Sequence, residues 1–185
     1  MSIKFERRTN LLGDELIYYH DEIKNLRYAL GEPKYNSMLF IGINPNTATS
    51  TKYDLTTNKI IKFASINQFN GWVLVNLIPD RSLSPKMLVK EENKPRLIQN
   101  ADVIRKLIVQ FEINSVCCCW GNSITTRSYL INSLKLICKN LENVDYFHLG
   151  SLTKGGHPKH PSRLGYNSSL NKMDINQYIH NFTNI

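Results

Sequence analysis

The side chains best suited to chemistry gather in four short segments of the sequence. Asn44 lies in the string GINPN, Asn76 ends the string VLVN, Trp120 opens the string WGN, and His160 begins the string HPSRLG. Amide and imidazole groups donate and accept hydrogen bonds without being strong bases. They are suited to orienting a water molecule, holding a polar ligand by its edge and stabilising a developing negative charge.

Each segment also has an ordinary structural interpretation. The Asn-Pro pair of the first segment is a common way to begin a loop, and Asn76 can cap a turn at a strand end. Trp120 suits a hydrophobic core. His157 and His160 form an HxxH pair, which is a weak metal signal without further ligands, so we expect no metal site. Only the four segments together therefore indicate a functional site.

The segments are positioned by apolar runs that are typical of buried strands, over residues 37–43, 72–77, 115–120 and 144–149. Apolar residues spaced by three and four predict helices over 56–69, 95–111, 124–136 and 172–182. Continuously apolar strands separated mostly by helices indicate a parallel sheet covered on both faces. We expect an α/β fold, a three-layer α/β/α sandwich around a central, mainly parallel four-stranded sheet, with ligands bound beyond the carboxyl ends of the strands.

Length and composition predict one globular domain over residues 1–185, in which 1–31 fits no single pattern. The chain is 42% hydrophobic, and 23 Lys and Arg against 15 Asp and Glu give a formal charge of +8, which favours a polyanionic partner. No apolar run is long enough to span a membrane, and the first ten residues lack a secretory apolar region, so we expect a cytoplasmic protein. The four cysteines have no disulfide or metal spacing and suit core thiols.

Taken together and in this order, the four segments resemble the motifs of the uracil-DNA glycosylase superfamily. That family has a first loop of the type G-x-[DNE]-P, an LLN-type strand end, a third strand ending in WG, and a final HPSPLS loop. The counterparts here are GINPN, VLVN, CCWGNSI and HPSRLG, which together span about residues 37–165. The sequence also resembles an uncharacterised bacterial and mobile-element group with G-x-N-P-[SN]-T-A and LTKxGxPxHP signatures, for which no activity can be carried over.

The resemblance implies a uracil-DNA glycosylase, a monofunctional hydrolase of base-excision repair that flips uracil out of DNA and cleaves its N-glycosidic bond without a cofactor. Asn44 would position the attacking water through its side-chain carbonyl, and His160 would hydrogen-bond uracil O2 as negative charge develops. Asn76 would read O4 and N3–H of the base. The other implied substrate-binding residues are Gly42, Ile43, Pro45, Asn46 and Tyr53. The implied DNA-binding residues are Lys159, Ser162, Arg163 and Leu164.

The resemblance also implies how the DNA-binding residues act, and a few other positions depart from the family pattern. Leu164 would enter the duplex as a wedge, while Lys159 and Arg163 would contact phosphates. Tyr53 is the candidate for the aromatic that stacks on the flipped base. Asn46 stands where the family often has a glycine or an aromatic that excludes thymine, which leaves the choice between uracil and thymine open. Three consecutive cysteines point to alternating faces of a strand, so the iron-sulfur cluster of some branches is not expected.

The implied partner is uracil-containing DNA, single- or double-stranded, bound by a monomer, and a DNA-mimicking inhibitor protein would be compatible with it. Two other functions stay open at this point. One is a glycosylase for another modified base on the same scaffold. The other is a nucleic-acid-binding relative that has lost catalysis, although binding alone requires none of Asn44, Asn76 and His160.

Overall fold

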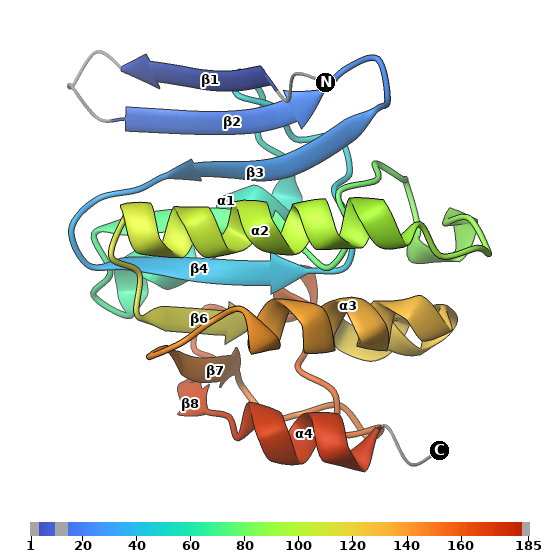
Figure 1. Ribbon diagram of the computed structural model, residues 1–185. Helices are drawn as coiled ribbons and strands as arrows, with labels where there is room; N and C mark the ends of the chain where they lie inside the picture. The colour runs from blue at the N-terminus through green and yellow to red at the C-terminus, as the bar shows by residue number, and fades with distance from the viewer. Residues whose placement is uncertain (1–3, 10–14, 183–185) are drawn as a thin grey trace.

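The computed structural model describes residues 4–9 and 15–182 of the chain. Its described residues form one eight-stranded sheet with the strand order β1-β2-β3-β5-β4-β6-β7-β8 (Figure 1). The strands are β1 (Lys4–Thr9), β2 (Glu15–Asp21), β3 (Leu26–Glu32), β4 (Ser37–Gly42), β5 (Gly71–Asn76), β6 (Ser115–Cys118), β7 (Asp145–Leu149) and β8 (Leu170–Lys172).

The expected four-stranded, mainly parallel sheet is wrong, because the sheet is mixed and has twice as many strands. The four apolar runs do form neighbouring parallel strands, in the order β5-β4-β6-β7. A meander of β1, β2 and β3 extends this group by antiparallel pairing with β5, and β8 pairs antiparallel with β7. Four of the seven strand pairings are therefore antiparallel.

Sequence patterns missed these added strands for physical reasons. In β2 and β3 consecutive residues are buried, so neither strand has the alternating polarity of a half-exposed strand. His20 and Arg27, which are polar, are among the buried residues of these strands and interrupt their apolar runs. β8 has three residues, too few to give a periodic signal.

Helices cover both faces of the sheet. They are α1 (Leu55–Ile66), α2 (Lys94–Gln110), α3 (Ser128–Lys139) and α4 (Ile175–Asn181). In Figure 1, α2 and α3 lie in front of the sheet and α1 lies behind it. Asp54, Asn93 and Asp174 accept hydrogen bonds from backbone N–H groups in the first turns of α1, α2 and α4, which supply partners for donors that a helix leaves free.

The hydrophobic core has two parts, one on each face of the sheet. One packs α2, α3 and α4 against the sheet, and the other packs Ile60, Phe63 and Ala64 of α1 against β4 and β5. Every residue of β4 and β5 is buried, so these central strands are fixed on both faces. Burying one large aliphatic or aromatic side chain contributes about 1.5–3 kcal/mol. In the described part of the chain, no helix is long and apolar enough to cross a membrane.

The parallel strands deliver their carboxyl ends to one edge of the sheet. The backbone ladder continues past the strands, since Leu77 N–H donates to the Gly42 carbonyl and Cys119 N–H donates to the Ile41 carbonyl, both at 2.9 Å. The loops that follow β4, β5 and β6 consequently start from a rigid base, which is the arrangement that precise side-chain placement requires.

Candidate active site

A cavity of about 830 Å³ lies beyond the carboxyl ends of β4, β5 and β6. It is closed on one side by the start of α1 and on another by the loop that contains the 3-10 turn Pro161–Arg163. Most of the residues singled out from the sequence line it: Gly42, Ile43, Asn44, Asn46, Asn76, Lys159, His160, Ser162 and Arg163. Segments more than 100 residues apart in the chain thus meet at one site.

Asn44 is held by its amide nitrogen. Its Nδ2 donates to the carbonyl oxygens of Ser82 at 2.8 Å and Pro45 at 2.9 Å. Ser82 N–H donates in return to the Pro45 carbonyl at 3.0 Å, which ties the loop after β4 to the loop after β5. Both amide hydrogens are thereby used, while Oδ1 accepts no hydrogen bond from the described residues. The side chain therefore offers a fixed acceptor at the cavity.

Asn76 forms part of the cavity floor and is 3% exposed. Both ends of its amide are satisfied in one orientation, in which Nδ2 donates to the Asn44 carbonyl and Oδ1 accepts from Nη2 of Arg27, each at 3.3 Å. The amide retains one further hydrogen and one further lone pair. Gly42 makes room for it, because a Cβ at that position would come within 2.8 Å of the Asn76 amide.

His160 presents one ring nitrogen to its own loop. Its Nδ1 accepts from the backbone N–H of Ser162 at 3.3 Å and lies 2.8 Å from Oγ of the same residue. Nδ1 is therefore an acceptor, and the neutral ring carries its proton on Nε2. Burial lowers the pKa of His160, nearby Asp54 raises it, and Arg163 lowers it. The result is a neutral imidazole with a free Nε2–H donor.

His157 is the other histidine of the loop, and it lies outside the cavity lining. It is 4% exposed, and its Nδ1 lies 2.8 Å from the hydroxyl of Tyr178. That hydroxyl accepts from Nε1 of Trp120 at 2.8 Å, so its own hydrogen is directed to His157. Phe182 packs beside the imidazole with ring centroids 4.5 Å apart. His157 is therefore a core residue that anchors the loop, while Trp120 is buried and also lines the cavity.

Gly121 connects this anchor to the cavity. Its N–H donates to the Pro158 carbonyl at 2.7 Å, and its φ of +63° is a conformation that favours glycine. The hydrogen bond from Gly121 thus fixes the backbone at Pro158, two residues before His160. The Trp-Gly pair after β6 and the distant loop that contains His160 are therefore joined in the fold.

The rim of the cavity is basic. Lys159 and Arg163 line it, and Nζ of Lys159 donates to Oγ of Ser151 at 2.8 Å. Arg163 is exposed, whereas Ser162 is half-buried and engaged with the His160 ring. Two cations at the mouth of a cleft attract an anionic ligand, and exposed lysine and arginine are the usual partners of backbone phosphates.

Pro45, Tyr53 and Leu164 do not line the cavity. Pro45 is buried behind it. The hydroxyl of Tyr53 donates to Glu32 at 2.7 Å, and its ring meets Trp72 edge-on at 5.6 Å. Leu164 is 7% exposed and belongs to the core on the α1 face. Neither a stacking role for Tyr53 nor a wedge role for Leu164 agrees with these positions.

Two charged residues that the sequence analysis did not single out also line the cavity. Arg27 comes from β3, and the signal in the sequence is a single charge inside the apolar string LRYAL. Asp54 is the one carboxylate among the described residues that line the cavity. Its Oδ1 caps α1 by accepting from the N–H and the hydroxyl of Thr57, at 2.8 and 2.9 Å.

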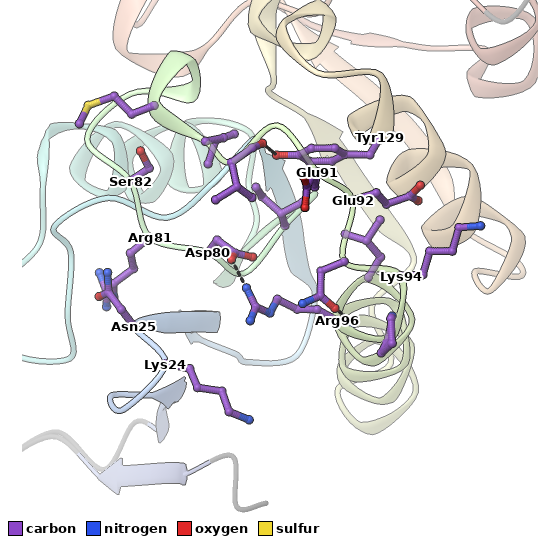
Figure 2. Close-up of a pocket in the computed structure, with 17 residues that line it drawn as sticks. Lys24, Asn25, Asp80, Arg81, Ser82, Glu91, Glu92, Lys94, Arg96 and Tyr129 are labelled. Carbon is purple, nitrogen blue, oxygen red and sulfur yellow. Dashed lines mark hydrogen bonds and ion pairs between the residues drawn. The ribbon is translucent and has the colours of Figure 1, made fainter.

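A second cavity of about 870 Å³ lies on the other side of the loop after β5 (Figure 2). Asp80 and Arg96 pair with each other there, and the hydroxyl of Tyr129 donates to the Val89 carbonyl. Ser82 is the residue that lines both cavities, and none of the residues singled out from the sequence lines the second one. Among the described residues, no group of three or more His, Cys, Asp or Glu side chains is placed to hold a metal ion.

Residues 27–162 match the family described as Protein of unknown function (DUF1643). The match covers almost three quarters of the chain, and the chain belongs to this family. It includes every segment that lines the cavity apart from Arg163, and Arg27 is its first residue. A comparison with curated proteins finds no match.

Proposed function

We propose that the protein is a monofunctional DNA glycosylase that hydrolyses the N-glycosidic bond of uracil in DNA. The observation that carries the proposal is the meeting of Asn44, Asn76 and His160 at one cavity beyond the parallel strands. The order of the four motifs, which resembles that of the uracil-DNA glycosylase superfamily, supports it independently.

The proposed reaction needs an oriented water more than a strong base. The water oxygen bonds to C1′ of the sugar as the C1′–N1 bond breaks, and the bonding pair leaves with the base. One proton of the water is finally transferred to the departed base, which gives free uracil and an abasic site. Asn44 Oδ1 is the fixed acceptor that aims the water, since its Nδ2 is committed to Ser82 and Pro45.

His160 would stabilise the negative charge that develops on O2 of the leaving base. Its Nδ1 is occupied by Ser162, so Nε2–H is the donor available. A pre-oriented donor of this kind typically contributes about 100- to 1000-fold in rate. Asn76 would recognise the base through its remaining hydrogen and lone pair, which match O4 and N3–H of uracil.

DNA would approach along the basic rim of the cavity, which Lys159 and Arg163 line, and these two residues would contact phosphates on either side of the flipped nucleotide. Leu164 has no part in this proposal, because its side chain is in the core. The enzyme would act as a monomer on single- and double-stranded DNA in the cytoplasm. DNA-mimicking inhibitor proteins would compete at the same rim.

The test is incubation with end-labelled oligonucleotides that contain uracil, thymine opposite guanine, hypoxanthine or 5-hydroxymethyluracil, followed by alkali. Scission at uracil by the wild type and its loss in an Asn44→Ala protein prepared in parallel is the expected result. Scission at one of the other bases alone would assign the site to that modified base. Binding without scission of any of them would contradict a catalytic function.

A further inference from the structure

Arg27 is a buried cation that forms no ion pair with another described residue. The residue is 2% exposed, and no carboxylate among the described residues contacts its guanidinium. Nη1 donates to the Ala48 carbonyl at 3.2 Å, and the buried Nε has no hydrogen-bond partner. Burial lowers the pKa of Arg27 to about 10, Arg81 lowers it too, and Asp54 and Tyr18 raise it, so the group stays charged at neutral pH. Burying a charge costs free energy, so packing alone does not account for an arginine at this position.

The Arg27 guanidinium contacts the side chain of Asn76, which lines the cavity. Nη2 of Arg27 faces Oδ1 at 3.3 Å, while Nδ2 faces the Asn44 carbonyl at 3.3 Å. Rotating the amide by 180° would direct its NH₂ group at the guanidinium and its oxygen at a carbonyl oxygen. Both contacts would then be repulsive, and both ends of a buried amide would lose their partners. Arg27 and the Asn44 carbonyl therefore lock the amide in one orientation.

We propose that Arg27 determines the specificity of the cavity by fixing the orientation of the Asn76 amide. In this orientation Asn76 binds bases that have a ring N–H beside a carbonyl group. It rejects bases that have an amino group beside an unprotonated ring nitrogen. This inference rests on the proposed function. The accepted class includes uracil, thymine and hypoxanthine, and the rejected class includes cytosine and adenine. An amide free to rotate would serve both classes, because its donor and acceptor would exchange places.

Two substitutions at Arg27 separate the effect of its charge from the effect of its side-chain volume. Arg27→Gln replaces the cation by an amide that can donate to or accept from Asn76, so the Arg27 half of the lock is removed while a polar neighbour and the Asn44 carbonyl remain. Arg27→Lys keeps a positive charge and offers donors only, so the lock is kept. Arg127→Gln is the matched control, since that guanidinium donates to backbone carbonyls, including those of Lys86 and Leu88, away from the cavity.

The first measurement is the single-turnover excision of uracil and of cytosine from matched oligonucleotides. In Arg27→Gln the ratio of the two rates should fall about tenfold or more, the size expected when a mispaired buried polar group is no longer penalised. Arg27→Lys should stay closer to the wild type, and the Arg127→Gln ratio should not change. An unchanged ratio in Arg27→Gln, or an equal fall in Arg27→Lys, would overturn the inference and leave the proposed function intact.

The second measurement needs no catalysis. Calorimetric titration of the wild type with free uracil, hypoxanthine, cytosine and adenine should give binding of the first two and about tenfold weaker binding of the others. If the oligonucleotides are not cleaved but this preference is found and is reduced in Arg27→Gln, the glycosylase proposal fails and the Arg27 inference survives. Equal affinity for uracil and cytosine, or no binding of any base, overturns the inference whichever variants fold.

Discussion

His157 and His160 lie three residues apart in one loop, but the side chain of His157 is enclosed in the core and that of His160 lines the cavity. The imidazole of His157 is enclosed by Tyr178 and Phe182, and its Nδ1 is engaged with a hydroxyl that Trp120 also contacts. The imidazole of His160 uses Nδ1 within its own loop and leaves Nε2–H free at the cavity. Both histidines use Nδ1 for a contact within the protein, so the difference lies in whether the ring is enclosed in the core, as in His157, or lines the cavity, as in His160.

The largest expected effect is that of removing the donor at the cavity. His160→Ala should lower the single-turnover rate of uracil excision by about 100- to 1000-fold, because the developing charge on O2 loses its donor. Affinity for uncleaved DNA should change little, as measured by fluorescence anisotropy. A variant with the wild-type rate would show that Nε2–H takes no part in the chemistry.

Leu164 lies in the same loop as the two histidines, and its side chain belongs to the core. Leu164→Ala should reduce the free energy of unfolding by about 2 to 3 kcal/mol, since a buried leucine leaves a cavity on the α1 face. Once the fraction of folded protein is corrected for, excision from single-stranded and duplex DNA should be equally affected. A selective loss on duplex DNA would restore a wedge role for this side chain.

His157→Ala is expected to affect stability alone. Removing the ring leaves the Tyr178 hydroxyl without its acceptor and should reduce the free energy of unfolding by about 1 to 2 kcal/mol in urea titrations. The rate per folded molecule should stay within about twofold of the wild type. A large fall in that rate, with His160→Ala active, would reverse the roles of the two histidines.

The smallest expected effect is that of mild acid on the wild-type rate. The active form of His160 is neutral, and burial holds its pKa below the ordinary value. At about pH 6.5, where a free histidine is half protonated, more than half of His160 is still neutral. Excision should therefore fall less than about twofold between pH 8 and pH 6.5 and decline only below that range. A greater loss above pH 6.5 would mean that the pKa is raised instead.

The sequence predicted the middle of the fold better than its edges. Strands β4 to β7 and the helices between them have long apolar runs or a clear helical period, and their places were confirmed. Strands β2 and β3 were missed because burial on both faces removes alternation, and His20 and Arg27 break the apolar runs. The described side chains of β1 are polar and mostly exposed, so that strand has no apolar run. The expected sheet of four strands was wrong for that reason.

The residues of the candidate site were also predicted only in part. Asn44, Asn76 and His160 were expected near one another because their strings follow parallel strands, and they do line one cavity. Arg27 could not be placed there, since its strand was not recognised and antiparallel pairing with β5 brings it to Asn76. Leu164 also shows the limit, because an apolar residue in a polar loop can point to the core or to a ligand with no local difference in sequence.

The most direct test of the account is a titration of isotope-labelled protein with free uracil, followed by the imidazole signals in ¹H–¹⁵N correlation spectra. Since the ligand would bind at the cavity, the Nε2–H signal of His160 should shift downfield in proportion to occupancy, while the signals of His157 stay in place. His160→Ala and His157→Ala assign the two sets of signals. Saturable shifts confined to His157, with the His160 signals unchanged, would contradict binding of the base at this cavity.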